Sequence, residues 1–144
     1  MIIEDVAPSL AARPKSLRQA ALFGLELGDR DAFLREFHDE FYVEPGADRR
    51  AAMLMDEPPL TEDARANAYY AAVAEHLAFK FHLPVPPWSG MPGRFLDRPF
   101  FPSGLESLKA TLLVESPTAF RRRMIFVGAD PLYRPRRDTP VFGM

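Results

Sequence analysis

TEDARANAYYAAVAEHLAFKF, residues 61–81, is the stretch that decides the fold of this chain. Thr61 can cap a helix at its start, and Glu62 and Asp63 follow where the positive end of the helix dipole favours carboxylates. Apolar side chains then cover most of the circumference of the expected helix. Because a helix of that composition is packed on several sides, we expect residues 69–81 to lie at the centre of the fold.

Three helices are expected before this stretch. Ser16 can cap the first and Gly28 can end it, with an apolar side formed by Leu17, Ala20, Ala21, Gly24 and Leu27. The second starts at Asp29 or Asp31 and shows a clear amphipathic pattern, with Phe33, Leu34, Phe37 and Phe41 at helical spacing. The third runs from about residue 47 to residue 56 and stops before two prolines.

Two further helix starts are expected in SGLESLKATLLVESPTAFRRRMIFV, residues 103–127. Ser103 and Glu106 have the spacing of a capping box, and Leu105, Leu108 and Leu112 then form one stripe. Ser116 followed by Pro117 repeats the start signal. The run 124–127 either continues the last helix or forms a short strand, because periodicity does not distinguish the two.

A long connector, residues 82–102, separates these two regions. It is rich in proline, and its aromatic residues are expected to hold it over the core, as a structural plug or as a flap over a groove: Trp88, Phe95, Phe100 and Phe101. The sequence therefore predicts an all-α, single-domain bundle of five or six helices with a long Pro/aromatic-rich connector. The domain spans residues 1–144, with loosely ordered ends at 1–14 and 130–144.

Composition excludes several classes of protein. The 144 residues contain no cysteine, so disulfides and thiolate metal sites are ruled out. The chain has neither a signal-peptide pattern at its start nor an apolar run of membrane-spanning length, and we expect a cytoplasmic protein that does not bind membranes. Residues 1–75 carry 15 acidic and 8 basic side chains, whereas residues 76–144 carry 5 and 10. This asymmetry suits an anionic partner, head-to-tail self-association in a homo-oligomer, or neutralisation within one chain.

No constellation for catalysis is recognisable. There is no G-x-S-x-G elbow, and the glycines of WSGMPGR, residues 88–94, do not fit a phosphate-binding loop. The three histidines, His38, His76 and His82, do not form an H-E-x-x-H pair. We therefore expect a protein that is not an enzyme and has neither a metal nor another cofactor.

The remaining candidate is the arginine cluster Arg121, Arg122 and Arg123. Helical phase places Arg121 and Arg122 outside, free to meet acidic groups of a partner protein, with Trp88 and nearby aromatic residues as anchors. Arg123 lies at the margin and is expected to pair internally with a carboxylate such as Glu106 or Glu115. The alternative is a small nucleic-acid-binding protein that uses the whole basic end, including Arg134, Arg136 and Arg137.

Three segments carry a resemblance: AMLMDEPPLTEDARANAYYAAVAEHLAFKFHLPVPPW (52–88), FLDRPFF (95–101) and GLESLKATLLVESPTAFRRRMIFV (104–127). They resemble an uncharacterised family of helical bacterial proteins, mostly from high-GC actinobacteria, over roughly residues 30–130. Some members carry an added repressor-type helix-turn-helix and look like antitoxin or regulatory components. This chain lacks that element, and Met124 stands where the family pattern has Asn. The resemblance implies a non-enzymatic interaction or regulatory protein, antitoxin-like or a toxin-antitoxin accessory component, that binds another protein.

Overall fold

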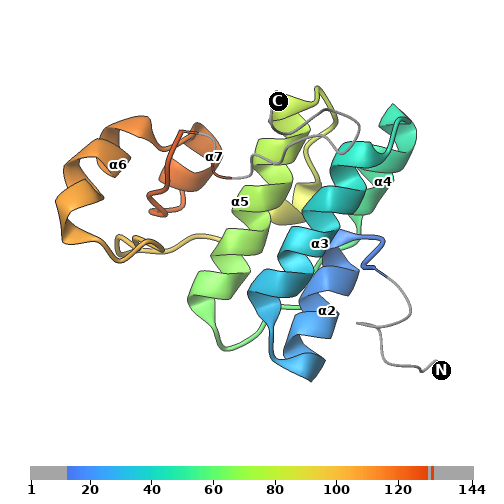
Figure 1. Ribbon diagram of the computed structural model, residues 1–144, viewed down its shortest axis with the longest axis horizontal. Coiled ribbons are helices and arrows are strands. Elements are labelled where there is room, and N and C mark those ends of the chain that lie inside the picture. The colour runs from blue at the N-terminus through green and yellow to red at the C-terminus, as the bar shows by residue number, and fades with distance from the viewer. Residues whose placement is uncertain (1–12, 130, 132–144) are drawn as a thin grey trace, which may run out of the picture. The chain divides into compact units, whose positions relative to one another are not determined.

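The computed structural model describes residues 13–129 and 131, and in this part the protein is helical (Figure 1). Six α-helices and two short 3-10 turns account for the regular structure, and no strand is present among the described residues, so the predicted all-α fold is confirmed. Most of the two ends expected to be loosely ordered lies outside the described residues. The chain divides after Pro58 into two compact units, which are described separately.

The first unit contains α2 (Leu17–Leu27), α3 (Arg30–Val43) and α4 (Ala47–Met55). As predicted, the Ser16 hydroxyl caps α2 by accepting the Gln19 N–H at 3.1 Å, and Gly28 ends it in the left-handed conformation. Asp29 caps α3, whose four predicted core residues are all buried. Of the apolar side predicted for α2, Leu27 is exposed, because it lies in the last turn beside the chain reversal at Gly28.

Arg50 of α4 defines how α3 ends. Its Nε donates to the carbonyl of Phe41 at 3.1 Å and its Nη2 to that of Tyr42 at 3.0 Å, which satisfies two of the carbonyls that a helix C-terminus leaves open. Phe41 and Leu54 are fully buried. The first unit is thus a small helical core closed by side-chain caps.

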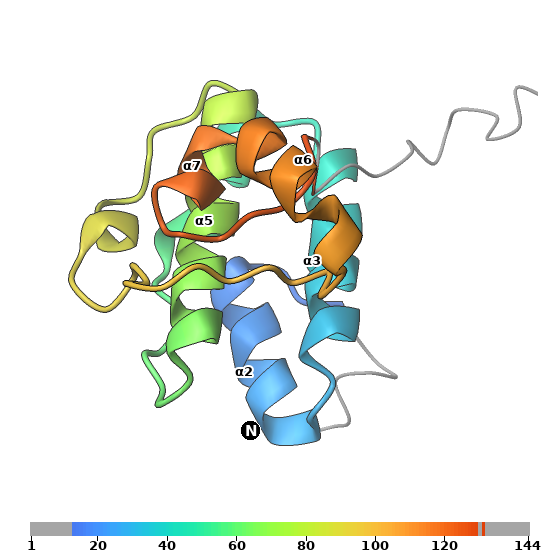
Figure 2. The ribbon, with the colours of Figure 1, turned by 90° about the vertical axis from the view of Figure 1, so that its left-hand side faces the viewer.

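The second unit is organised on α5 (Ala64–Lys80), against which α7 (Thr118–Arg121) and the 3-10 turn η1 (Pro87–Gly90) pack (Figures 1 and 2). The cap of α5 differs from the prediction. The carboxylate of Asp63 accepts the Ala66 N–H, whereas Thr61 exchanges hydrogen bonds with the side chain of Asn67. Asp63 is favoured because its charged oxygen lies at the positive end of the helix.

The predicted capping box at Ser103 is wrong. Gly104 adopts φ 70°, so the chain turns before a helix can begin, and the Ser103 hydroxyl accepts the Leu105 N–H instead of capping a helix. The 3-10 turn η2 (Glu106–Leu108) follows and leads into α6 (Lys109–Glu115), while Glu106 pairs with Lys109. Of the predicted leucine stripe, only Leu112 is buried.

Ser116 also differs from its predicted role as a cap. Its buried hydroxyl donates to the Leu112 carbonyl at 2.6 Å and accepts the Val127 N–H at 2.9 Å, so it joins the end of α6 to the chain beyond α7. Pro117, with no N–H to satisfy, takes the cap position of α7 instead. The Ser116 hydroxyl therefore bonds backbone groups of two chain segments and does not cap the four-residue helix α7.

The segment after Arg123 neither continues the helix nor forms a strand. Phe100 and Ile125 make one parallel bridge, and Phe101 stacks on Phe126 with 5.2 Å between ring centroids. Met124 ends the helical turn at φ 64°, a conformation that Asn adopts more readily than Met.

His82 offers a test of helix termination. It follows α5 at φ 59°, and the Leu83 N–H reaches back to the Ala78 carbonyl at 2.7 Å, which is a Schellman motif with an exposed His in place of Gly. We expect His82→Gly to raise the free energy of unfolding by about 0.5–1 kcal/mol, because Gly relieves the left-handed strain. Urea unfolding of His82→Gly and of His82→Ala checks this. The Ala variant keeps the strain, so a gain shared by both variants would refute the assignment.

Candidate functional site

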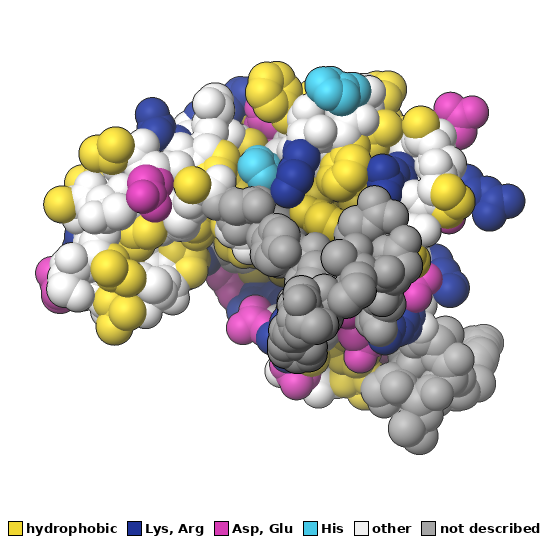
Figure 3. Space-filling view, turned by 45° about the horizontal axis from the view of Figure 1, so that its top comes forward, with side chains coloured by type: hydrophobic (Ala, Val, Ile, Leu, Met, Phe, Trp, Pro, Cys, Tyr) yellow, Lys and Arg dark blue, Asp and Glu magenta, His cyan; other side chains and the backbone are white. Residues whose placement is uncertain are grey.

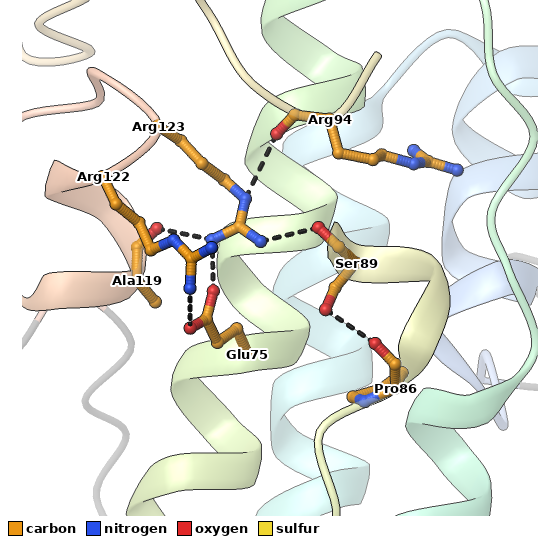
Figure 4. A network of polar contacts seen from close by, with 7 residues as sticks. All are labelled: Glu75, Pro86, Ser89, Arg94, Ala119, Arg122 and Arg123. Carbon is orange, nitrogen blue, oxygen red and sulfur yellow. Dashed lines mark hydrogen bonds and ion pairs between the residues drawn. The ribbon is translucent and has the colours of Figure 1, made fainter. Parts of the chain in front are cut away.

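Arg123 is the most completely bonded side chain of the cluster, and it is fully buried (Figure 4). Its Nε donates to the Arg94 carbonyl at 3.1 Å and its Nη2 to the Ser89 carbonyl at 2.7 Å. Its Nη1 donates to the Ala119 carbonyl at 2.8 Å and to the carboxylate of Glu75 on α5. Four of the five guanidinium N–H groups are thereby used, and they connect α5, η1, the connector and α7.

The charge of Arg123 is held in place by that carboxylate. Burial lowers the pKa of the Arg123 guanidinium from its ordinary value, and the ion pair with Glu75 acts in the opposite direction. A buried guanidinium without such a partner is strongly destabilising. The predicted internal role of Arg123 therefore agrees with its position, but the expected partners Glu106 and Glu115 are replaced by Glu75.

Arg122 shares the same carboxylate from the outside. Its Nη1 lies 2.9 Å from the second oxygen of Glu75, and half of its side chain is exposed. Both Arg122 and Arg123 lie over the ring of Phe95, at 5.3 and 4.6 Å from the guanidinium carbon to the ring centroid. Phe95 of the connector and Glu75 of α5 thus hold two adjacent arginines, one buried and one half-exposed.

Arg121 points to a different part of the unit. It is exposed, and its Nη2 donates to the carbonyls of Val114 at 2.7 Å and Ser116 at 2.9 Å, which cap the C-terminal end of α6. Within the described part of the chain, its Nε and Nη1 have no bonded partner. Arg121 is therefore a cation fixed at one end of α6 with donors still available.

Trp88 does not lie at the surface in this structure. It is buried in η1, and the guanidinium of Arg94 stacks over its indole at 4.8 Å from the ring centroid. Arg94 is itself buried, donates to the Asn67 carbonyl, and points away from the Glu75 network (Figure 4). The connector is thus held down through Trp88 in the manner of a plug, and Trp88 is not displayed as an anchor for a partner.

Exposed apolar side chains occur on several elements, Phe79 of α5 among them, and one group of them lies on η2 and α6. Opposite the buried Leu112, the outer face of α6 carries apolar side chains at the helical spacing i, i+3 and i+4. Two exposed leucines precede α6, Leu108 in η2 and Leu105 directly before it. This η2–α6 surface consists of Leu105, Leu108, Ala110, Leu113 and Val114. Val114 is 76% exposed and Leu113 is 48% exposed. Figure 3 shows hydrophobic side chains on the surface of the part of the molecule where α6 lies in Figure 1. Apolar residues on two opposite faces are typical of a helix that packs against other protein segments on both sides.

A signal for the Glu75 site is present in the sequence. Glu75 is the only acidic residue of the largely apolar stretch AAVAEHLA, residues 71–78, where the expected helix is packed on several sides. An acidic residue in such a position requires a cationic partner. The outer face of α6 was missed for another reason, because the leucine spacing from Leu105 to Leu112 indicated only one apolar stripe.

Other kinds of site find no support in the described residues. No group of three His, Asp or Glu side chains there could hold a metal ion, and none of the helices described is long and apolar enough to cross a membrane. Comparison of the chain with protein-family models, curated proteins and solved structures returned no match.

The two neighbouring arginines allow a matched test. We expect Arg123→Met to lower the free energy of unfolding by about 3–5 kcal/mol, because it breaks a buried ion pair and leaves three carbonyls unbonded. Arg122→Met should cost less than about 1 kcal/mol, since half of its side chain is in water. Chemical unfolding followed by circular dichroism measures both. Similar losses for the two variants would show that Arg123 does not have the role assigned here.

Proposed function

We propose that this protein is a non-enzymatic interaction protein that docks onto another protein chain through the η2–α6 surface. The observation that carries the proposal is the outer face of α6, which exposes Ala110, Leu113 and Val114 where a helix on the surface of an isolated domain has polar residues. Exposed apolar surface of this kind is typical of sites of protein interaction.

The energetics favour such a role. Complete burial of a Leu or Val side chain contributes about 1.5–3 kcal/mol, so covering the exposed parts of Leu113 and Val114 together contributes about 2–4 kcal/mol. Leu105 and Leu108 add to this sum, since both are exposed. The total is large enough to offset part of the loss of translational and rotational freedom on association.

Arg121 supplies specificity at the edge of this surface. Its guanidinium is held by the carbonyls of Val114 and Ser116, so little side-chain freedom is lost when a carboxylate of the partner binds its remaining donors. The expected role of Arg121 in meeting acidic groups is thus supported by its geometry. Arg122 is available only in part, because Glu75 already binds it.

The antitoxin-like role suggested by the family resemblance is one form of this function, in which the partner is the product of a neighbouring gene. Nucleic-acid binding has less support. A phosphate backbone would have to compete with Glu75 for Arg122, and Arg123 is buried. Arg134, Arg136 and Arg137 lie outside the described residues.

A pair of charge insertions tests the proposal. Proteins that co-purify with the tagged wild-type chain are first isolated. The affinity of each for the wild type, for Val114→Lys and for Phe79→Lys is then measured by calorimetry. Both substitutions lie near a helix C-terminus, where Lys is well tolerated, and Phe79 is 79% exposed on α5. We expect Val114→Lys to weaken the complex at least tenfold and Phe79→Lys to leave it unchanged.

Two results would refute this function. One is a saturable complex that Val114→Lys leaves intact while thermal unfolding shows both variants to be folded. The other is the absence of any protein partner together with duplex binding whose affinity falls steeply with salt, which would favour the nucleic-acid alternative.

A further inference from the structure

Charged side chains lie at both ends of the η2–α6 surface. Glu106 lies at its beginning with 84% of its side chain exposed, and Arg121 lies at its far end, bonded to the carbonyl of Val114. The only bonded partner of Glu106 in the described part of the chain is Lys109, in an exposed i,i+3 pair of the kind that contributes little to stability. Glu115 is exposed and stands between Val114 and Ser116, whose carbonyls accept hydrogen bonds from Arg121.

With Glu106 and Lys109 at one end and Glu115 and Arg121 at the other, the surface is complementary to a second copy turned end over end, because Glu106 then meets Arg121 and Lys109 meets Glu115. In such an antiparallel pair, Glu106 of each chain approaches Arg121 of the other, and the apolar residues between them face one another. Residue 110 lies midway between Glu106 and Val114, whose carbonyl binds Arg121, so the two-fold axis would pass close to Ala110. Its small side chain allows the two helices to approach closely.

We propose that this chain forms a two-fold symmetric homodimer in which α6 of one copy packs antiparallel on α6 of the other, with two Glu106–Arg121 ion pairs at the ends. The inference rests on the proposed function, since it names a second copy as a protein that docks on the η2–α6 surface.

The dimer is weak because the surface is small. A helix of seven residues is about 10 Å long, and five apolar side chains with two ion pairs cover less than the roughly 800 Å² per partner of a standard interface. A dissociation constant on the order of 100 µM is expected for a contact of this class. Monomer and dimer should therefore exchange within the range of concentrations accessible to sedimentation.

Sedimentation equilibrium between about 10 µM and 1 mM tests the proposal, with a dissociation constant on the order of 100 µM expected. Glu106→Arg places like charges at both ends, and Ala110→Glu places two carboxylates at the axis while remaining favourable in the first turn of α6. Each should weaken the dimer at least tenfold, whereas Phe79→Lys, elsewhere in the same unit, should not. A wild type that stays monomeric at 1 mM, or a dimer indifferent to both substitutions, overturns the inference.

Cross-linking tests the geometry independently. The chain has no cysteine, so Ala110→Cys introduces a single thiol beside the proposed axis. Under mild oxidation, we expect this variant to form a disulfide-linked dimer much faster than Phe79→Cys does. Equal rates would overturn the antiparallel arrangement.

The same variants separate this inference from the proposed function. If the chain is monomeric but another protein binds it in a manner that Val114→Lys abolishes, only self-association fails. If neither self-association nor partner binding depends on the η2–α6 surface, both proposals fail.

Discussion

The ion pair between Glu75 and Arg123 is the interaction on which the second unit depends. One guanidinium bonds a carboxylate of α5 and three carbonyls from η1, the connector and α7, so four segments of the second unit meet at one side chain. A planar group with five donors is well suited to bind the carbonyls of Ser89, Arg94 and Ala119 at the same time.

This arrangement also determines which residues remain for function. Arg123 is buried and bonded within the unit, and Arg122 is partly neutralised by the same carboxylate, that of Glu75. Trp88 is covered by Arg94. The surface that we propose for recognition is instead the exposed apolar face of α6 with Arg121 at its end. The three arginines, adjacent in sequence, have three different roles: an internal tether, a half-exposed ion pair and a cap on a neighbouring helix.

Much of the fold could be predicted because it depends on local interactions. The limits of α2 and α3 follow from Ser16, Gly28 and Asp29, each of which acts on backbone groups within a few residues. The prediction failed where long-range contacts compete with local ones. Ser116 has the sequence of a helix cap but bonds Val127 instead, and the turn at Gly104 displaces the helix from the capping box at Ser103.

In the candidate site, too, local features could be predicted from the sequence and long-range contacts could not. Helical phase correctly separated Arg123 from its two neighbours, since that distinction depends only on the angle between successive residues. Its partner could not be found by spacing, because Glu75 lies 48 residues away and is brought close by the packing of α7 on α5. The outer face of α6 could not be recognised as exposed until Leu112 was known to be the one buried residue of that helix.

A double-mutant cycle tests the central role of the Glu75–Arg123 pair most directly. The free energies of unfolding of the wild type, Glu75→Gln, Arg123→Met and the double variant give the coupling between the two side chains, and the corresponding set with Arg122→Met gives the coupling of the outer pair. We predict a coupling above about 1.5 kcal/mol for Arg123 and below about 1 kcal/mol for Arg122. A coupling near zero for Arg123, or equal couplings for the two arginines, would contradict the account.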